Sequence, residues 1–425
     1  MWILIALLLV QFGISTMLSA LNLAHLKESA QDIPPKWAER LDLTQFPRMI
    51  AYSTARMRLG LASRLAGLAV TLVILLSGLL PALVRWAATL SVGPIWQGLI
   101  VMAVPAAISY VSDLPWDLAA QFGVERRFGF STITLKTWLL DQVKSLLLAL
   151  VLGLILGSGL LWLVGWLGPW WWLPAWVLFT LFQLLMTLIA PVLILPLFNK
   201  FEPLQDEALR EGILDLAQKA AFPVSGVFQV DASLRSTHSN AYFFGLGKTR
   251  RIALYDTLIE QHTHEEILSV MAHEIGHWAK KHVVKMMAAS VVLSGIGMAV
   301  VARLLDVPWL YETIGATESY TSVGVAGPVA AVGLYVVGIL LSPVSLILSP
   351  ITNGYSRHNE YEADAYSLRL YPHPRALEEG LVRLSEKNLS NLFTHPLVVF
   401  FQYSHPPLLQ RVEAIRRQTD TTLSQ

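Results

Sequence analysis

The sequence centres on one short stretch, Met271-Ala272-His273-Glu274-Ile275-Gly276-His277-Trp278. In a helix, residues four apart lie on one face, one turn above the other. His273 and His277 can therefore direct two imidazole nitrogens at one metal ion. Glu274 follows the first histidine and can hold and deprotonate a metal-bound water. This arrangement is the H-E-x-x-H pattern of zinc peptidases.

The residues before this stretch predict the helix that it needs. Thr263-x-x-Glu266 has the form of a capping box directly ahead of an apolar run. Apolar residues then recur at helical spacing, namely Ile267, Leu268, Met271, Ile275 and Trp278. The alternative is an ordinary helix with two surface histidines, so a third ligand has to decide between a metal site and chance.

A candidate third ligand lies downstream, in Ser356-Arg357-His358-Asn359-Glu360-Tyr361-Glu362-Ala363-Asp364. A catalytic zinc takes three protein ligands and leaves its fourth position open for water. Glu360 and Asp364 are four apart, so both carboxylates face the same way on a helix. One can bind the metal while the other accepts a hydrogen bond from a ligand histidine. Taken alone, the same run could be an ordinary solvated acidic helix face.

Five separated motifs together resemble the integral-membrane zinc endopeptidases that include the type I CAAX prenyl proteases. The resemblance covers residues 30 to 417 and rests on the H-E-I-G-H and S-R-x-x-E-x-x-A-D runs and on three further stretches: Pro196-Leu197-Phe198-Asn199-Lys200-Phe201, Thr237-His238-Ser239-Asn240-Ala241-Tyr242-Phe243 and Tyr403-Ser404-His405-Pro406-Pro407. Similar proteins have seven membrane helices around a water-filled chamber, with the zinc site facing inward. The resemblance implies the same architecture here.

With this resemblance the chemistry takes a definite form, metal-assisted hydrolysis of an amide. One Zn²⁺ per chain is expected on His273, His277 and Glu360. The ion lowers the pKa of a water and polarises the scissile carbonyl. Glu274 takes the proton of that water and later passes it to the leaving amine.

Four further residues complete the predicted site. His405 is expected to bind substrate and to donate a hydrogen bond to the oxyanion, on the strength of its motif. Asp364 is expected to orient a ligand histidine, and Arg357 either pairs with Asp364 or meets a substrate carboxylate. Asn240, beside a candidate edge strand, is expected to grip an extended substrate. His238 is a fourth metal candidate, but the favoured interpretation is a structural or substrate-facing residue. Six further histidines are interpreted as surface or core residues: His262, His264, His282, His358, His373 and His395.

Composition indicates a membrane protein. Of 425 residues, 54% are hydrophobic and 14% charged, with mean hydropathy +0.53, whereas soluble domains carry about 25% charged residues. The net charge of +1 implies no bulk attraction to nucleic acid. Because the chain has no cysteine, any zinc must be held by histidine and carboxylate.

The predicted fold is mostly α, a polytopic membrane protein with a zincin-like catalytic domain that contains a few short strands. About seven apolar runs are long enough to span a bilayer, at 2–21, 62–84, 94–112, 145–168, 172–195, 284–304 and 327–350. They divide the chain into an N-terminal membrane region (1–195, about five spans), a catalytic loop domain (196–283), two further spans (284–350) and a C-terminal catalytic segment (351–425). Strands are expected at 226–230, 251–255 and 240–244.

Loop charges predict the orientation. The loops after the first, third and fifth spans are rich in Lys and Arg, whereas those after the second, fourth and sixth hold at most one such residue. Basic loops stay in the cytoplasm. The N-terminus is therefore expected outside or in a lumen, and the catalytic segments and C-terminus in the cytoplasm. The host membrane would be the inner or plasma membrane in a prokaryote and the endoplasmic reticulum in a eukaryote.

Several functions remain open at the level of the sequence. The favoured one is a membrane-embedded zinc endopeptidase, either removing C-terminal residues after a prenylated cysteine or degrading peptides and damaged membrane proteins without prenyl specificity. Its partners would be a peptide or protein substrate and the lipid bilayer. A metal-binding transporter or receptor is the alternative of another class, but the predicted spans are almost free of the charges that mark a transport pathway. A pseudo-enzyme that only binds peptides would have no need of Glu274.

Overall fold

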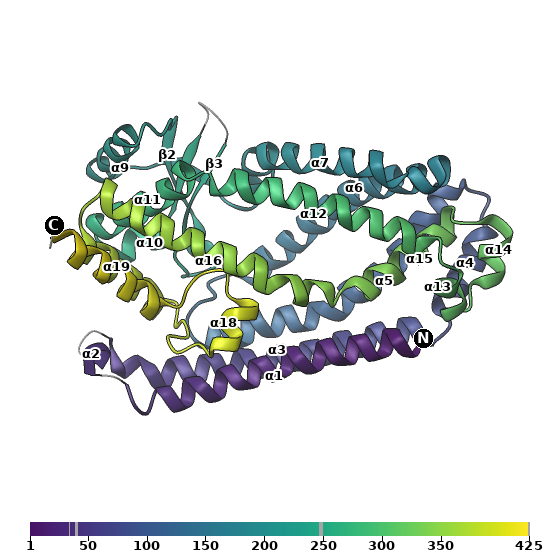
Figure 1. The fold of residues 1–425 in the computed structure, drawn as a ribbon, viewed down its shortest axis with the longest axis horizontal. Coiled ribbons are helices and arrows are strands. Elements are labelled where there is room, and N and C mark those ends of the chain that lie inside the picture. The colour runs from purple at the N-terminus through teal and green to yellow at the C-terminus, as the bar shows by residue number, and fades with distance from the viewer. Residues whose placement is uncertain (34, 39–40, 246–249, 424–425) are drawn as a thin grey trace.

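The computed structural model describes residues 1–33, 35–38, 41–245 and 250–423. Positions 246–249 of the predicted loop domain and 424–425 of the predicted C-terminal segment lie outside the described residues. Long helices run side by side along the long axis of the molecule, and the strands gather with α9, α10, α11 and α19 at one end (Figure 1). The N-terminus lies at the opposite end from the C-terminus.

The long helices confirm the polytopic architecture. Six of the described helical segments are long and apolar enough to cross a membrane, and a seventh span results if one bent helix pair counts as a single span. The helices concerned are α1 (Trp2–Ser29), α3 (Phe46–Leu76), α5 (Pro94–Leu118), α6 (Leu135–Leu167), α7 (Trp172–Ile189), α12 (His282–Leu305) and the pair α15 (Gly327–Leu341) and α16 (Val344–Leu370). With α7 counted together with the helical turns that continue it to Phe198, the shortest of the six segments is α12, whose 24 residues measure about 36 Å at 1.5 Å per residue, enough for about 30 Å of hydrocarbon.

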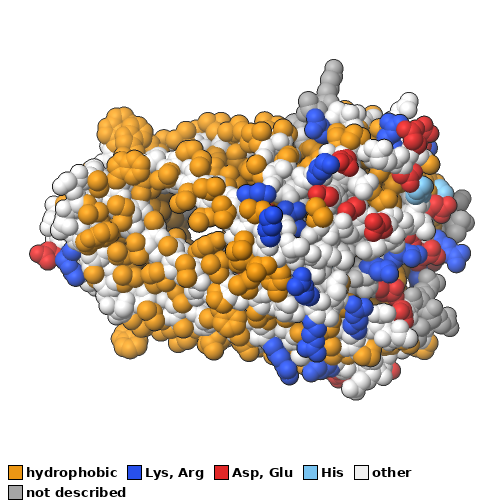
Figure 2. Space-filling model, turned by 180° about the vertical axis from the view of Figure 1, so that it is seen from behind, with side chains coloured by type: hydrophobic (Ala, Val, Ile, Leu, Met, Phe, Trp, Pro, Cys, Tyr) orange, Lys and Arg blue, Asp and Glu red, His pale blue; other side chains and the backbone are white. Residues whose placement is uncertain are grey.

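The outer surface of these helices is apolar, as contact with lipid requires. Large side chains such as Leu150, Ile155, Leu178 and Leu181 are more than half exposed on α6 and α7. Hydrophobic side chains cover most of the visible face, whereas Lys, Arg, Asp and Glu concentrate at the end that carries the catalytic elements (Figure 2). That end therefore lies at or beyond the polar membrane surface.

Two predicted spans differ from the observed helices. The run predicted at 62–84 is interrupted at Gly78, whose φ of +76° ends α3, and α4 (Leu79–Ala88) follows as a separate short helix. The run predicted at 327–350 bends by 57° between α15 and α16. α16 then continues far beyond the apolar run, to Leu370. The segment with the carboxylate motif is thus the continuation of a membrane helix.

The remaining helices are short or belong to the catalytic end. They are α2 (Pro35–Ala38), α8 (Leu195–Phe198), α9 (Glu207–Lys219), α10 (Asp256–Gln261), α11 (His264–Ala279), α13 (Pro308–Thr313), α14 (Thr317–Val323), α17 (Pro374–Lys387), α18 (Pro396–Gln402) and α19 (Leu408–Leu423), with 3₁₀ turns at Leu43–Gln45, Gly168–Trp170 and Ala232–Leu234 and π-helical turns at Ala119–Glu125 and Ala190–Ile194.

A four-stranded mixed sheet supports the catalytic end. Its order is β1-β2-β4-β3, with β2 (Gly226–Val230) parallel to β4 (Arg251–Tyr255) and the other neighbours antiparallel. The two strands predicted at these positions are confirmed. The third candidate forms β3 (Ala241–Phe244) at one edge, and β1 (Phe201–Pro203), which was not predicted, forms the other.

Candidate active site

Helix α11 presents the H-E-x-x-H residues, and its sequence fixes both where it begins and which face is buried. The Thr263 side chain accepts a hydrogen bond from the Glu266 N–H at 3.3 Å, and Glu266 accepts one from the Thr263 N–H at 2.9 Å, so the predicted capping box is confirmed. Ile267, Met271 and Ile275 are fully buried against the sheet and α9. The histidine side of α11 is thereby directed toward α16.

A glycine lets α16 pass very close to α11. A Cβ atom at Gly276 would lie 3.0 Å from the Ala363 carbonyl oxygen and 3.1 Å from its Cα. Real Cβ atoms rarely come this close to a backbone, so a larger residue would push the helices apart. Beside this crossing the Ser367 hydroxyl donates to the Ser269 carbonyl at 3.2 Å. The crossing explains why the two motifs, far apart in the sequence, meet.

Three side chains from these helices converge on one point. His273 Nε2 and His277 Nε2 are 3.1 Å apart, and each lies 3.4 Å from a different carboxylate oxygen of Glu360. His273 and Glu360 are buried. Within the described part of the chain, the buried Glu360 Oε2 has no hydrogen-bond partner. Two imidazoles and an unsatisfied carboxylate fit a divalent transition metal, and the set matches that of catalytic zinc.

Glu274 stands beside this cluster. It lines a cavity of about 970 Å³ together with His277, and Trp278 and Phe243 contribute to the mostly apolar wall. Burial raises the pKa of the Glu274 carboxyl, against the opposing influence of His273 and His277. A carboxylate with a raised pKa in a water-accessible cavity suits a group that must both accept and release a proton.

Asp364 and Arg411 support the first histidine. Asp364 Oδ1 lies 2.8 Å from His273 Nδ1, and Arg411 donates to both Asp364 oxygens, at 2.9 and 2.6 Å. Arg411 also lies 3.6 Å from Glu360 Oε2. Asp364 thus contacts the histidine that it was expected to orient. The sequence did not single out Arg411, because Arg416 and Arg417 occupy the same helix and look equivalent in the sequence.

Arg357 does not pair with Asp364. It donates instead to the Val399 and Tyr403 carbonyl oxygens, at 2.8 and 2.6 Å. The first of the two predicted roles is therefore wrong for this structure, because Arg411 takes the carboxylate. Arg357 fixes the end of α18, from which the chain runs directly to His405.

His405 lies at the rim of the site, and Asn240 lies at the start of the edge strand β3. His405 Nε2 is 3.3 Å from Glu360 Oε1, and its side chain is 65% exposed. Asn240 directly precedes the edge strand β3, and its Oδ1 accepts a hydrogen bond from the N–H of Ala241 at 2.8 Å. Both residues are exposed, in positions where a peptide could reach them.

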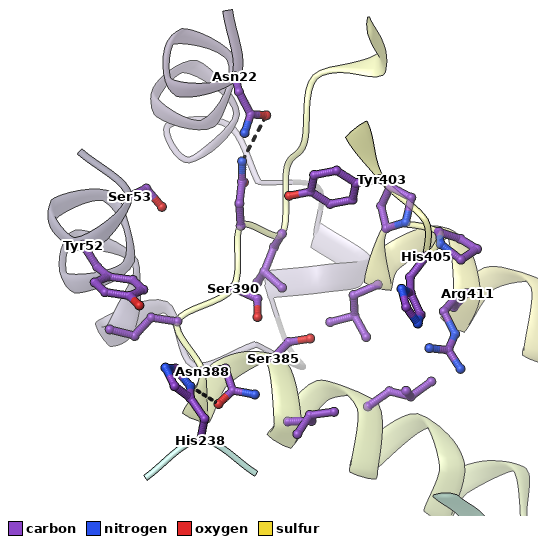
Figure 3. A pocket seen from close by; sticks show the side chains of 18 of the residues that line it. Asn22, Tyr52, Ser53, His238, Ser385, Asn388, Ser390, Tyr403, His405 and Arg411 are labelled. Carbon is purple, nitrogen blue, oxygen red and sulfur yellow. Dashed lines mark hydrogen bonds between the residues drawn. The ribbon is translucent and has the colours of Figure 1, made fainter. Parts of the chain in front are cut away.

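A second cavity, of about 700 Å³, borders the cluster on the side of His405. His405 and Arg411 form one wall, while Tyr52 and His238 face them across the space (Figure 3). His238 Nδ1 lies 2.7 Å from Asn388 Oδ1. The lining of this cavity is mixed, with a larger polar share than that of the mostly apolar cavity beside Glu274. The metal-ligand cluster therefore lies between two cavities of different character.

A helical membrane region and a buried His-His-Glu cluster with an adjacent glutamate define a membrane metallopeptidase. Comparisons with known proteins agree: the family described as "CAAX prenyl protease N-terminal, five membrane helices" matches residues 22–200, and "Peptidase family M48" matches residues 203–419. The chain belongs to the CAAX prenyl protease 1 family of M48 zinc metalloproteases.

Individual relatives match over most of the chain. CAAX prenyl protease 1 of Saccharomyces cerevisiae is 32% identical, over 92% of this chain and 89% of the relative. The human CAAX prenyl protease 1 homolog is 29% identical, over 90% and 88%. The crystal structure of S. mikatae Ste24p matches with a TM-score of 0.90 at 32% identity, over 97% of this chain and 98% of that one. The expected family and fold are thereby confirmed.

Proposed function

We propose that this membrane metalloprotease removes the C-terminal residues that follow a prenylated cysteine, using one zinc ion held by His273, His277 and Glu360. The observation that carries the proposal is the convergence of these three side chains beside Glu274, between a mostly apolar cavity and one of mixed lining. Bound zinc would polarise the scissile carbonyl and lower the pKa of a water.

Four further side chains have separate roles in the proposed reaction. Glu274 accepts the proton of the attacking water and delivers it to the leaving nitrogen. His405, 3.3 Å from the Glu360 carboxylate, donates a hydrogen bond to the oxyanion. Asp364 holds the ring of His273. An extended peptide adds along β3, the edge strand of the sheet that the described residues form, where Asn240 contacts its backbone.

The apolar cavity is the feature that favours a substrate carrying a lipid chain. Met186 of α7 and Val283 and Val284 of α12 contribute to its wall, next to Glu274. An apolar chain attached close to the scissile bond would be buried there, at a gain of about 0.8 kcal/mol per CH₂. The cavity on the other side of the cluster, which Arg56 and Arg411 help to line, suits the released residues and their free carboxylate.

The catalytic end is proposed to face the cytoplasm. Its surface carries most of the Lys and Arg side chains visible in Figure 2, and basic segments are retained on the cytoplasmic side. Accessibility of single cysteines, introduced into this naturally cysteine-free chain, would test the orientation in sealed vesicles.

The function is tested with two matched peptides, one with a farnesylated cysteine in a C-a-a-X tail and one with a bare cysteine. The purified chain should release the last three residues from the farnesylated peptide, as read by mass spectrometry, and a chelator should abolish the cleavage. Glu274→Gln should keep zinc and lose about 10²- to 10⁴-fold in turnover. Glu265→Gln, an exposed glutamate of the same helix, is the matched control.

Each outcome separates the alternatives. Equal cleavage of both peptides would keep the zinc mechanism and indicate a general peptide-degrading protease. Zinc binding without cleavage of either peptide would contradict the proposed substrate class.

A further inference from the structure

The second histidine ligand, His277, is supported by a pair of residues that the mechanism above does not use. His277 Nδ1 lies 2.9 Å from His282 Nδ1, and His282 Nε2 lies 3.0 Å from the Glu362 carboxylate. The three side chains form an unbroken chain of hydrogen bonds that leads away from the metal-ligand cluster. The His282 side chain is 2% exposed and that of Glu362 is 32% exposed.

The direction of each hydrogen bond follows from the position of the cluster. His277 Nε2 points at His273 and Glu360, so in a metal complex its lone pair is used there and the proton resides on Nδ1. That N–H donates to His282 Nδ1, which must therefore be the unprotonated nitrogen. His282 consequently carries its proton on Nε2 and donates it to Glu362. With His277 Nε2 directed at the metal, only this arrangement of protons forms both hydrogen bonds of the series His277–His282–Glu362.

The backbone holds His282 in this place rigidly. Lys281 adopts a left-handed conformation, with φ of +58°, and so turns the chain sharply between α11 and α12. His282 is the first residue of α12 and is buried. Glu362 lies on α16, two positions after the ligand Glu360. The support of His277 thus connects all three helices that surround the cluster.

We propose that His282 and Glu362 are positioning residues that fix the ring orientation and the tautomer of His277 for zinc binding. This inference rests on the zinc site of the proposed function. Partners of ligand histidines commonly change metal affinity by about 10- to 100-fold when they are removed. His282 is buried and lines neither of the two cavities, so its contribution is made through His277.

Two substitutions of similar polarity separate positioning from simple packing. Asn at 282 places its carbonyl oxygen near the position of the histidine Nδ1, so it can still accept the His277 N–H. Gln at 282 places its amide near Nε2, so it reaches Glu362 but leaves His277 without an acceptor. A packing role predicts that Gln, which fills more of the histidine volume, does at least as well as Asn.

The experiment measures zinc affinity of the full chain in detergent, by competition with a chromophoric chelator. His282→Asn should stay within about threefold of the parent, whereas His282→Gln and His282→Ala should bind zinc about 10- to 100-fold more weakly. The visible spectrum of bound Co²⁺ should be preserved in His282→Asn and altered in His282→Gln. The same pair of substitutions at the exposed His264, the first residue of α11, should change neither quantity.

The results also distinguish this inference from the proposed function. If His282→Gln binds zinc as well as or better than His282→Asn, or if all three variants match the parent, the positioning role is wrong while the zinc site stands. If the parent chain binds no zinc, the proposed site itself is wrong. Thermal unfolding of each variant, followed by tryptophan fluorescence, identifies any substitution that only prevents folding, and the Asn-to-Gln comparison is then made on the folded pair.

Discussion

The two histidine ligands lie one turn apart on α11, yet the protein supports them in different ways. His273 rests on Asp364, which Arg411 holds in a two-pronged ion pair, and all three side chains are at most 11% exposed. His277 rests on the neutral ring of His282 and, beyond it, on Glu362 at the edge of solvent. The same task, orienting an imidazole, is thus performed once by buried charge and once by a neutral relay.

The difference teaches where the protein is vulnerable. Removing one partner of a buried ion pair leaves the other charge desolvated and costs about 3–5 kcal/mol, whereas an exposed pair contributes about 0–1 kcal/mol. Substitutions of Asp364 or Arg411, which support His273, should therefore lower the free energy of unfolding as well as the zinc affinity. Substitutions of His282 or Glu362, which support His277, should lower mainly the zinc affinity. Four substitutions test this contrast.

Arg411→Met should have the largest effect. It leaves Asp364 as a buried carboxylate without its guanidinium, and also removes the cation 3.6 Å from Glu360. We expect a loss of about 3–5 kcal/mol in the free energy of unfolding, seen as a large decrease in the thermal midpoint. Arg416→Met is the matched control, since Arg416 pairs with Glu378 at a more exposed position of the same helix. Equal midpoints for the two variants would contradict the contrast.

Asp364→Asn should have the next largest effect, on folding as well as on zinc, with a smaller loss of stability than Arg411→Met because the Glu360 carboxylate, 3.6 Å from Arg411, remains as a counter-charge. An asparagine oxygen can still accept the His273 N–H, but the negative charge that strengthens this bond is lost and Arg411 loses its partner. Zinc affinity should decrease by about 10- to 100-fold, measured by chelator competition. A decrease no larger than that of Glu362→Gln would show that the two supports are equivalent after all.

The parts of this site that the sequence predicted are those encoded within single helices. His273, Glu274 and His277 were found through the spacing of one helix, and the capping box located the beginning of that helix. Arg411 was missed because its partner Asp364 lies 47 residues away along the chain. His282 was missed because, although it is five residues from His277, its other partner, Glu362, lies 80 residues away. No local pattern distinguishes such residues from ordinary surface or core side chains.

The fold likewise has a part that the sequence predicts and a part that it does not. Apolar runs predicted the membrane helices because lipid contact demands about 20 apolar residues in each. The bend between α15 and α16, and the continuation of α16 into the catalytic end, could not be predicted. Within this pair of helices, α15 packs against the membrane helix α5, and α16 packs against α11. Their sequence pattern therefore reflects two different contacts at once.

Gly276→Ala tests both histidines at once. The added Cβ would lie 3.0 Å from the Ala363 carbonyl oxygen and would separate α11 from α16. Overpacking costs about 1–3 kcal/mol, partly offset by about 1 kcal/mol of helix propensity. Zinc affinity should weaken because Glu360 moves away from both imidazoles. Gly297→Ala, at a position of α12 where a Cβ would meet nothing within 4 Å, is the control and should leave zinc affinity unchanged.

Glu362→Gln should have the smallest effect. Its amide oxygen can still accept the proton of His282 Nε2, and the lost charge is partly screened because the side chain is 32% exposed. Zinc affinity should stay within about threefold of the parent, a change of at most about 0.6 kcal/mol, and the thermal midpoint should not move. A tenfold loss would mean that charge, and not the direction of a hydrogen bond, supports His277. The two ligands would then be supported alike, and the neutral ring of His282 would only transmit the field of a carboxylate.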